Sequence, residues 1–587
     1  MIEAWSVADV RAAEEPLLAA GAPLMERAAF ALATVVARDL ARRRSVALPD
    51  GGRRDGRVTG ARAVLLVGSG NNGGDTLHAG AYLARRGVEV LAVLTGEHAH
   101  PGGLAALRDA GGRVEVLVGS PDDASRADRP HDHLDAHVAD RVASQVARAD
   151  VVLDGLVGIG SRGPLRGVAG DLVARVSAVL DDGARAGLDG RAGLDGRPGP
   201  GIELRAGSGG RGRPWVVAVD APSGIGVDDG TVPGPVLRAD RTVTFGAAKP
   251  GLLLPPATHL AGRGAVVDIG LRLADRVRSE DGDAARPVVR RLEPADVAAR
   301  WVVPGPTDHK YTRGVVGVVA GTSTYPGAAV LVTSAAVRAG AGMVRFRGPD
   351  DVTRAVLAAR PEVVPAAGRV QSWVLGPGVP PVPGPDDEPA GDGGQHDRIG
   401  SALAAATGEL AADVAGPRVP VVVDAGALSL LPERCPPSAV LTPHAGELAT
   451  LLRSRGDDVT RADVEAEPLR WARRAHAATG ATVLLKGSAT VVVGPEGAWS
   501  QSDAPAWLAT AGAGDVLAGI LGTVLAAHSE RVVHEPGLAA ELAAVAAVVH
   551  GLAAERANPG GPVAALDVAG AVPAVVAELL AARSEGF

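Results

Sequence analysis

Cysteine and aromatic residues are scarce in this chain of 587 residues. The single cysteine, Cys435, cannot form an intramolecular disulfide, and no thiol cluster is available to bind zinc. Aromatic side chains account for only 2% of the residues, so alanine, valine and leucine must fill the hydrophobic cores. These absences exclude a disulfide-stapled fold and fit a protein of the reducing cytoplasm.

The sequence also lacks the usual features of membrane and nucleic-acid-binding proteins. The formal net charge is -8, and the basic residues are dispersed along the chain. The first residues are acidic where a secretory signal would be basic and then apolar, and no run of about 18 uninterrupted apolar residues occurs. We therefore expect a cytoplasmic protein with no membrane span and no nucleic-acid partner.

Lysine and asparagine are unusually rare. Only Lys249, Lys310 and Lys486 among the 59 basic residues are lysine, and two of the three asparagines are the adjacent pair Asn71 and Asn72. A chain that otherwise uses arginine can retain lysine where a compact, rotatable ammonium group is needed. Compositional bias is the alternative explanation. All three lysines lie in the motifs described below, which favours a functional explanation for their retention.

Hydrophobic patterning indicates two α/β domains in succession. The chain exceeds the length of about 250–300 residues at which a single core stops growing. Residues 1–41 have helical spacing, and the strands that follow alternate with helical intervals, which predicts mostly parallel sheets. The apolar rhythm is lost between residues 268 and 294, so we expect domains at 1–285 and 290–587, with solvated loop insertions at 181–214 and 379–398. The expected strands are Ala63–Val67, Val88–Leu94, Val151–Leu153, Val216–Val219, Arg241–Phe245, Val315–Ala320, Trp373–Leu375, Val421–Val423, Ser438–Leu441, Thr482–Leu485 and Thr490–Val493.

Polar residues follow three predicted strands of the first half. The strand ending at Val67 leads into the glycine-rich segment 68–75, and Asp154 and Asp220 directly follow two later strands. Ligands bind at the carboxyl ends of parallel strands, and a glycine turn before a helix presents backbone N–H groups to phosphate. Each carboxylate could instead cap a helix. Three such strand ends together favour one ligand pocket.

These segments resemble the NAD(P)H-hydrate epimerase family. The matching motifs are NNGGD at 71–75, DGLVGIGSRGPLRG at 154–167, VDAPSG at 219–224 and TFGAAKPG at 244–251, and the resemblance covers nearly all of residues 1–270. It implies a Rossmann-like α/β/α sandwich that interconverts the R and S forms of hydrated NAD(P)H. The residues that it implies for binding the hydrated nucleotide are Asn71, Asn72, Gly73, Gly74, Asp75, Gly158, Ile159, Gly160, Ser161, Arg162, Gly163, Pro164 and Asp220.

The same resemblance implies a potassium ion held by Asn72, Asp154 and Ser223. Amide, carboxylate and hydroxyl oxygens are hard ligands suited to an alkali cation and unsuited to zinc. The substrate carries a hydroxyl on C6 of the reduced ring, beside the ring nitrogen, so a proton shuttle can expel it and add it back on the other face. Our hypothesis is that Asp220 is the shuttle and that Lys249 stabilises anionic groups.

The second half contains a phosphoryl-transfer signature. Thr510–Asp515 (TAGAGD) precedes an apolar helical run, and small residues at a helix N-terminus form an anion hole with an aspartate placed to activate a hydroxyl. A helix-capping turn is the alternative. The four-residue motif Gly-X-Gly-Asp, where X is any residue, is characteristic of ribokinase-like kinases when it precedes a helix. The motif therefore predicts a ribokinase-like α/β domain after the first.

Further segments of the second half resemble the NAD(P)H-hydrate dehydratase family. The motifs are DHK at 308–310, YPGAA at 325–329, RAGAG at 338–342, GPG at 376–378, LTPHAGE at 441–447 and LKG at 485–487, over about residues 300–570. The resemblance implies dehydration of the S hydrate to NAD(P)H, with ADP as co-substrate, Mg²⁺, and AMP and phosphate as products. It implies that Ala328, Gly378, His444 and Asp515 contact the hydrated nucleotide, and that Lys486, Gly487, Ser488, Ala489, Thr490 and Gly514 hold ADP.

Dehydration by phosphorylation is chemically reasonable. Hydroxide is a poor leaving group, whereas a phosphorylated C6 oxygen departs readily when the ring nitrogen lone pair pushes it out. Asp515 would deprotonate the hydroxyl, and Lys486 would neutralise phosphate charge. His444 could instead hydrogen-bond a loop, and Lys310 could be a surface charge.

Some positions depart from the dehydratase pattern. Gly426 stands where relatives have a second carboxylate in Asp-Ala-Asp-Ala-Leu, and residues 503–507 replace an Asn-Pro-Gly stretch. Ala511 and Ala513 also replace residues of the customary Thr-Gly-Gly-Ser-Gly-Asp. These changes touch the nucleotide site, so they bear on affinity and on the choice between ADP and ATP.

Two other functions remain open at this stage. A hydroxymethyl-pyrimidine or thiazole kinase joined to a nucleotide-sensing module would release a stable phosphoester. A non-catalytic binding protein would have no need of Asn72, Asp154 and Asp220 together. The resemblance also suggests a homo-oligomer.

Overall fold

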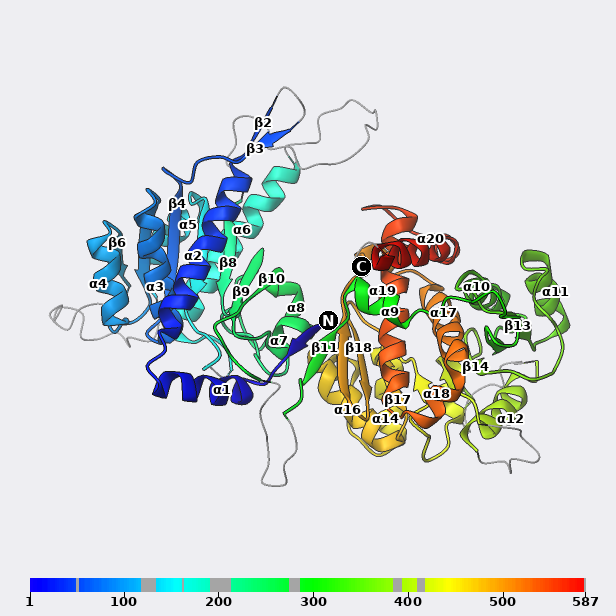
Figure 1. Cartoon of the computed structure of the whole chain (residues 1–587). Helices are drawn as coiled ribbons and strands as arrows, with labels where there is room; N and C mark the ends of the chain where they lie inside the picture. Colours follow the sequence, from blue (N-terminus) through cyan, green and yellow to red (C-terminus); the bar gives the residue numbers. More distant parts are fainter. Residues whose placement is uncertain are drawn as a thin grey trace. The chain divides into compact units, whose positions relative to one another are not determined.

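The computed structural model describes residues 1–48, 52–117, 134–160, 163–189, 213–273, 285–383, 393–408 and 418–584. It forms two compact units, shown in Figure 1. The N-terminal unit contains Ala4–Leu252 and Pro256–Arg286. The C-terminal unit contains Met1–Glu3, Leu253–Pro255 and Pro287–Phe587. Ser161 and Arg162 lie outside the described residues, as do parts of both predicted insertions.

The N-terminal unit is built on a seven-stranded parallel sheet with the order β10-β9-β8-β7-β4-β5-β6. Its strands are β4 (Arg62–Val67), β5 (Glu89–Leu94), β6 (Arg113–Val116), β7 (Val151–Gly155), β8 (Trp215–Val219), β9 (Arg241–Phe245) and β10 (Arg263–Val267). A two-stranded sheet pairs β2 (Val46–Ala47) with β3 (Arg53–Arg54). The helices are α1 (Val7–Ala19), α2 (Leu24–Arg43), α3 (Asn71–Ala84), α4 (Pro101–Asp109), α5 (Ala136–Ala147), α6 (Gly167–Asp189), α7 (Pro250–Leu253) and α8 (Thr258–Ala261).

The side chains of β4 point alternately to the two faces of the sheet, which explains the layers of this unit. Leu65 packs into a core with α2, α3 and α4, whereas Leu66 packs into a second core with α5 and α6. Side chains of a strand point to opposite faces in turn, so a continuous apolar run serves a sheet covered on both sides. The predicted α/β/α sandwich is confirmed.

The C-terminal unit contains a ten-stranded sheet with the order β1-β11-β19-β18-β17-β16-β15-β14-β12-β13. β18 runs antiparallel to β17 and β19, whereas the pairs from β13 across to β17 are parallel. Its strands are β1 (Ile2–Ala4), β11 (Val289–Arg291), β12 (Val315–Val319), β13 (Met343–Phe346), β14 (Ser372–Leu375), β15 (Val421–Val423), β16 (Ala439–Leu441), β17 (Thr482–Leu485), β18 (Thr490–Gly494) and β19 (Gly497–Gln501).

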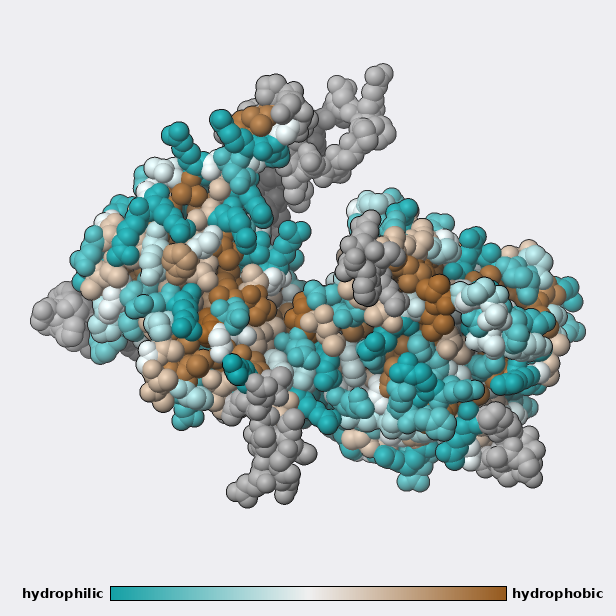
Figure 2. Space-filling model, viewed as in Figure 1, coloured by the Kyte–Doolittle hydropathy of each residue, from teal (hydrophilic) through white to brown (hydrophobic). Residues whose placement is uncertain are grey.

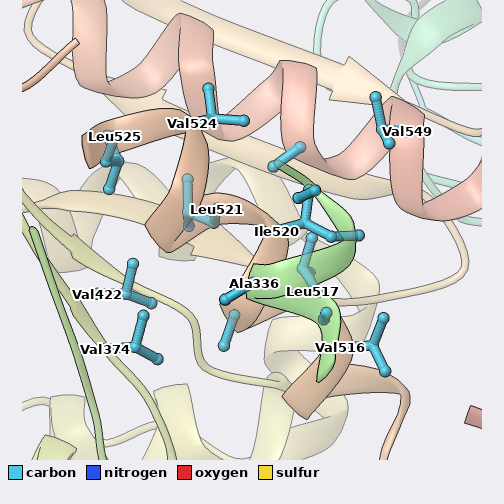
Figure 3. Close-up of a cluster of buried hydrophobic side chains, with 14 of the residues drawn as sticks. Ala336, Val374, Val422, Val516, Leu517, Ile520, Leu521, Val524, Leu525 and Val549 are labelled. Carbon is cyan, nitrogen blue, oxygen red and sulfur yellow. The ribbon is translucent and has the colours of Figure 1, made fainter. Parts of the chain in front are cut away.

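Helices cover this sheet, and the main core lies beneath α10, α17, α19 and α20. Figure 3 shows Val374 and Val422 of the sheet beside Leu521 and Val524 of α17. The α/β class predicted for both halves is confirmed. The helices are α9 (Pro294–Arg300), α10 (Pro326–Arg338), α11 (Asp350–Ala359), α12 (Gln395–Thr407), η2 (Ala425–Leu430), α14 (Ala445–Ser454), α15 (Arg461–Ala466), α16 (Pro468–Thr479), η3 (Ala506–Leu508), α17 (Ala513–Ala527), α18 (Ser529–His534), α19 (Leu538–Ala557) and α20 (Ala565–Ser584).

Glycine allows α17 to pack closely on its neighbours. A Cβ on Gly519 would lie 2.4 Å from the carbonyl oxygen of Val332 in α10, and a Cβ on Gly522 would lie 2.3 Å from Cγ2 of Val374. A larger residue at position 519 would require a backbone shift, and one at position 522 would displace the packed side chain of Val374. The helix that begins with the predicted anion hole is therefore held against both α10 and the sheet.

The structure differs from the sequence predictions at three places. Residues 1–41 are not uniformly helical, because Ile2–Ala4 is a strand and residues 20–23 separate α1 from α2. The last residues of the predicted insertion 379–398 begin α12 at Gln395. Strands β6, β10 and β13 were missed because they are sheet edges, where half-exposed strands carry charged residues and lose the continuous apolar pattern; strands β2, β3, β11 and β19 were not predicted either.

Among the residues that the structure describes, two helices are long and apolar enough to cross a membrane by length and composition, Leu538–Ala557 and Ala565–Ala582. The apolar window of the first is 83% buried within the protein, and that of the second is 33% buried. Figure 2 shows hydrophobic patches within a mainly hydrophilic surface. Leu566 of α20 is among the exposed large hydrophobic residues, with an exposed fraction of 50%.

Two candidate active sites

The glycine turn of the N-terminal unit is shaped by close backbone contacts. α3 begins at Asn71, after Gly70 as its N-cap. A Cβ on Gly73 would lie 2.0 Å from the carbonyl oxygen of Gly68, so only glycine fits there. The side chain of Asn72 is buried on the first turn of the helix, and that of Asp75 is half-buried.

Asp154 and Ser223 form a buried cluster at the ends of β7 and β8. Asp154 has an exposed fraction of 0%. Its carboxylate accepts hydrogen bonds from Ser223, over 2.6 Å from Oγ and 2.8 Å from the backbone N–H. Burial raises the pKa of Asp154, and the hydrogen bonds from Ser223 and Leu156 oppose that rise. Neutral donors therefore surround this carboxylate.

Asn72 lies beside this cluster through the loop that follows β7. Its Oδ1 would lie 3.4 Å from a Cβ on Gly158, and its Nδ2 is buried with no hydrogen-bond partner among the described residues. Asn72, Asp154 and Ser223 thus supply amide, carboxylate and hydroxyl oxygens from three strand ends. No group of three histidine, cysteine, aspartate or glutamate residues suited to a metal ion occurs in the described part of the chain.

Asp220 and Lys249 form a buried ion pair. Asp220 follows β8 with a φ of 66°, a left-handed conformation that non-glycine residues rarely adopt. The Lys249 ammonium donates to Oδ1 of Asp220 over 2.5 Å, to Oγ1 of Thr244 over 2.8 Å and to the carbonyl of Phe245 over 2.9 Å. Lys249 has an exposed fraction of 1%. All three of its N–H groups are therefore engaged.

Asn72, Asp220 and Lys249 line a cavity of about 500 Å³. Burial, followed by the charges of Asp220 and Glu14, raises the pKa of Asp75 to about 8. Asp75 also has an Oδ1 atom that lacks a partner among the described residues. Of the predicted substrate-binding residues, the lining includes Asn71, Asn72, Asp75, Gly158, Ile159, Gly160 and Asp220, and it does not include Gly73, Gly74, Gly163 or Pro164.

Replacing Asp75 with asparagine should raise the melting temperature of the N-terminal unit, and by more at about pH 8.5 than at about pH 5. A pKa raised to about 8 means that the unfolded chain releases a proton which the folded protein retains, so stability falls as pH rises from about 4 to 8. Asparagine removes that penalty. Calorimetry of Asp75→Asn and of the exposed control Asp109→Asn tests this, and an equal shift at both pH values would contradict it.

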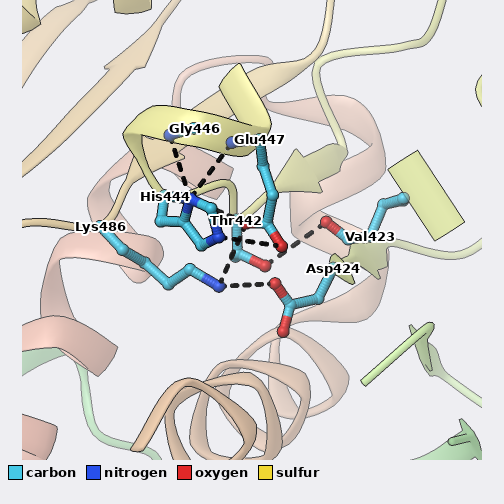
Figure 4. Close-up of polar contacts among 7 residues, drawn as sticks. All are labelled: Val423, Asp424, Thr442, His444, Gly446, Glu447 and Lys486. Atoms are coloured by element: carbon cyan, nitrogen blue, oxygen red, sulfur yellow. Dashed lines mark hydrogen bonds and ion pairs between the residues drawn. The ribbon is translucent and has the colours of Figure 1, made fainter. Parts of the chain in front are cut away.

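In the C-terminal unit, a lysine lies beside carboxylates near the ends of the sheet strands (Figure 4). Asp424 follows β15, and Lys486 follows β17. The Lys486 Nζ atom lies 2.7 Å from Oδ1 of Asp424 and 3.9 Å from Oε2 of Glu447. Burial alone would lower the pKa of Lys486, but the carboxylates of Asp424, Glu447 and Asp515 raise it above its usual value.

Asp515 lies in the first turn of α17, beside this cluster. The helix begins after Gly512, which has a φ of +85°, and a Cβ on Gly514 would lie 3.3 Å from the Lys486 Nζ atom. Burial, followed by the charge of Asp424, raises the pKa of Asp515 to about 7, and Lys486 opposes the rise. The helix N-terminus, a lysine and a carboxyl group of near-neutral pKa thus meet in one place.

The other predicted dehydratase residues lie at three places in the C-terminal unit. Gly378 has a φ of +67°, and a Cβ on it would lie 2.4 Å from Cβ of Ala328, so these two predicted substrate contacts are adjacent. His444 caps α14 by accepting from the backbone N–H groups of Gly446 and Glu447 over 3.0 and 3.1 Å. The turn between β17 and β18 contains Gly487, Ser488 and Ala489, and Thr490 begins β18.

Sequence reasoning missed several residues of these sites. Asp424 and Glu447 were read only as parts of motifs, although Asp424 directly follows a buried strand as Asp154 and Asp220 do. That position was the available signal. His550 of α19 is a further buried group, with a pKa lowered to about 4 by burial despite a hydrogen bond to the backbone of Ala513. Lys310 is exposed, with its Nζ atom 5.3 Å from the centre of the Tyr311 ring.

Gly426 leaves no room for the second carboxylate of the dehydratase pattern. A Cβ there would lie 2.3 Å from the carbonyl oxygens of both Val379 and Pro380. We expect Gly426→Ala to destabilise the C-terminal unit by about 2 kcal/mol or more, because backbone atoms must move. Denaturant unfolding measures this, with Gly400→Ala, whose Cβ meets no atom within 4 Å, as control. An unchanged midpoint for Gly426→Ala would contradict this account.

Comparison with known sequences identifies the family. The family described as YjeF-related protein N-terminus matches residues 21–251, and the family described as NAD(P)H-hydrate dehydratase matches residues 316–567. The bifunctional NAD(P)H-hydrate repair enzyme Nnr of Mycobacterium tuberculosis is 40% identical over 539 residues, which cover 89% of each chain. The enzyme of that name from Mycobacterium leprae is 40% identical over 576 residues, covering 95% of this chain and 94% of the other.

The chain belongs to the family of bifunctional NAD(P)H-hydrate repair enzymes. It contains both kinds of domain that the family combines, an epimerase and a dehydratase. The NAD(P)H-hydrate epimerase of Clavibacter sepedonicus is 39% identical over 276 residues, covering 46% of this chain and 92% of that protein. The resemblance noted for each half of the sequence is therefore confirmed, as is the choice of an enzyme over a binding protein.

Solved structures align with half of the repair enzyme. The ADP/ATP-dependent NAD(P)H-hydrate dehydratase of Bacillus subtilis, crystallised with ATP and Mg²⁺, aligns with a TM-score of 0.40 and 24% identity, over 50% of this chain and 99% of that one. A ribokinase-like protein of Enterococcus faecalis aligns with a TM-score of 0.41 and 19% identity, over 52% and 99%.

Proposed function

We propose that the chain converts both epimers of hydrated NAD(P)H back to NAD(P)H, with residues 1–285 acting as the epimerase and residues 290–587 as the dehydratase. The observation that supports this most directly is that each unit holds one of its few lysines against a carboxylate at a strand end. Lys249 pairs with Asp220, and Lys486 pairs with Asp424. Two separate sites in one chain suit two successive reactions on one metabolite.

In the epimerase site, Asp220 is the proton shuttle. It lines the cavity, and Lys249 together with Thr244 and the Phe245 N–H holds one of its oxygens, Oδ1. A carboxylate held in this way can accept a proton from a water that attacks C6 and return it to a departing hydroxyl. Lys249 stabilises the charge on Asp220, because its own donors are already engaged.

Asn72, Asp154 and Ser223 are proposed to hold potassium. Asp154 is fully buried, and no cation pairs with it among the described residues, so a bound cation would supply the missing positive charge. The oxygen donors fit an alkali ion. When bound, potassium would position the loop after β7 and any substrate phosphate near it.

In the dehydratase site, Asp515 takes the proton from the C6 hydroxyl while that oxygen attacks the terminal phosphate of ADP. AMP leaves, the ring nitrogen lone pair then expels the phosphorylated oxygen from C6 as phosphate to leave an iminium, and loss of a proton from C5 forms the C5–C6 double bond of NAD(P)H. Lys486 neutralises phosphate charge from beside the N-terminus of α17. Glu447 is suited, with the nucleotide's phosphates, to hold Mg²⁺, which would neutralise further phosphate charge.

ADP is the proposed co-substrate, although the chain departs from the usual pattern beside the nucleotide site. Ala511, Ala513 and residues 503–507 lie directly before or within the anion hole, and Gly426 follows Asp424. We expect these departures to change nucleotide affinity while leaving the reaction class intact. A cytoplasmic homo-oligomer with no nucleic-acid or membrane partner completes the proposal.

One assay distinguishes this function from a small-molecule kinase. The enzyme is supplied with mixed R and S hydrates of NADH and with ADP or ATP, and both the epimers and the nucleotide are followed. We expect both epimers to disappear, NADH absorbance to return and orthophosphate to form. Accumulation of a stable phosphoester without NADH would instead identify a kinase.

A further inference from the structure

Helix α1 presents one side to the epimerase cavity. Arg11, Glu14 and Leu18 line the cavity at spacings of three and four residues, which places them on one face of the helix. Val10 and Ala13 on another face are buried in a cluster with residues 5, 247, 273 and 285. The helix is thus fixed in place. It lies before residue 21, where the match to the YjeF-related family begins.

Arg11 reaches the loop that is proposed to bind the substrate. Its Nη2 atom would lie 3.0 Å from a Cβ on Gly160. The side chain is exposed, and no hydrogen bond or ion pair holds its guanidinium among the described residues. Its electrostatic neighbour is Glu14, one turn along the helix. Arg11 therefore has free donors at the cavity wall.

The charges that line the cavity indicate which kind of ligand group the free N–H donors of Arg11 can bind. Glu14 and Asp220 are acidic, and Lys249, the other cation among the described residues of the lining, already donates three hydrogen bonds to protein oxygens. A dinucleotide brings at least two further negative charges on its phosphates. A guanidinium binds phosphate oxygens with two parallel N–H groups, whereas the carboxylates repel them.

We propose that Arg11 binds a phosphate group of the hydrated dinucleotide and so sets the affinity of the epimerase for its substrate. The group is either the pyrophosphate common to both substrates or the 2′-phosphate of the NADPH form. This inference rests on the proposed epimerase activity, and it assigns to α1 a role in substrate binding.

Steady-state kinetics of the full-length protein test the proposal. Arg11→Ala and Arg11→Lys are compared with Arg38→Ala, which removes an exposed arginine from α2. Epimerisation of hydrated NADH and hydrated NADPH is measured separately, with nucleotide-dependent dehydration of the same preparation as an internal reference. We expect Arg11→Ala to raise the epimerase KM about tenfold with kcat within about twofold of wild type, and Arg11→Lys to recover part of the loss.

A comparison of hydrated NADH with hydrated NADPH shows which phosphate group of the substrate Arg11 binds. A higher KM for both assigns the pyrophosphate, and a higher KM for hydrated NADPH alone assigns the 2′-phosphate. An unchanged KM for both, or an equal effect of Arg38→Ala, overturns the proposal for Arg11. An inactive wild-type epimerase would instead refute the proposed function, so the two failures are distinguishable.

Discussion

Replacing Asp515 with asparagine should lower kcat for nucleotide-dependent dehydration by a factor of about 10²–10⁴, the usual contribution of a general base. The carboxyl group lies in the first turn of α17 beside Lys486, where it can take a proton from a hydroxyl directed at a phosphate. Asparagine keeps the shape but cannot accept that proton. The measurement is the recovery of NADH absorbance from pure S hydrate with ADP.

The pH dependence of wild-type dehydration gives an independent check on Asp515. Burial raises its pKa to about 7, so the fraction of enzyme with an ionised base falls as pH drops through 7. We expect kcat/KM to fall about tenfold per pH unit below that value. The exposed Asp458→Asn should behave as wild type. A profile that stays flat down to pH 5 would contradict the assignment.

Replacing Asp220 with asparagine should abolish interconversion of the R and S hydrates, with a loss in kcat of about 10²–10⁴. Dehydration of pure S hydrate should continue at the wild-type rate, because its residues belong to the other unit. Chiral separation of the two hydrates over time measures the loss. Retained interconversion in folded protein would refute Asp220 as the shuttle.

For Asp220→Asn, a loss of activity caused by a less stable fold must be distinguished from a loss caused by removal of the proton shuttle. Asp220→Asn leaves the buried Lys249 ammonium without its counter-charge, which typically costs about 3–5 kcal/mol. We therefore expect the double variant Asp220→Asn, Lys249→Met to be more stable than Asp220→Asn, yet equally inactive. Asp109→Asn, at the exposed end of α4, controls for charge. Recovery of epimerase activity together with stability would contradict a chemical role.

Much of both sites was predictable because strand ends are easy to recognise in parallel α/β folds. Continuous apolar runs ended at Val67, Leu153 and Val219, and polar residues followed each of them. The resulting cavity lining includes residues predicted from those runs. The GAGD motif gave the start of α17 in the same way, because small residues before an apolar run indicate a helix N-terminus.

Other features depend on contacts that sequence spacing does not reveal. β1 joins the sheet of the C-terminal unit although it begins the chain, and its three residues carry no pattern that indicates a partner. The pairing of Asp424 with Lys486 joins residues 62 positions apart. Arg11 belongs to no motif in the sequence, and only the folded structure shows that one side of α1 lines the cavity. Edge strands and long-range ion pairs are set by tertiary structure, so local patterns miss them.

Complementation between two variants that each lack one of the two activities tests the central claim most directly. Asp220→Asn and Asp515→Asn proteins are given mixed R and S hydrates with ADP, first separately and then together. We predict that Asp220→Asn converts only the S hydrate, that Asp515→Asn equilibrates the epimers without forming NADH, and that the mixture converts both epimers completely. Failure of the mixture to consume the R hydrate, or loss of both activities in either single variant, would contradict two independent sites in one chain.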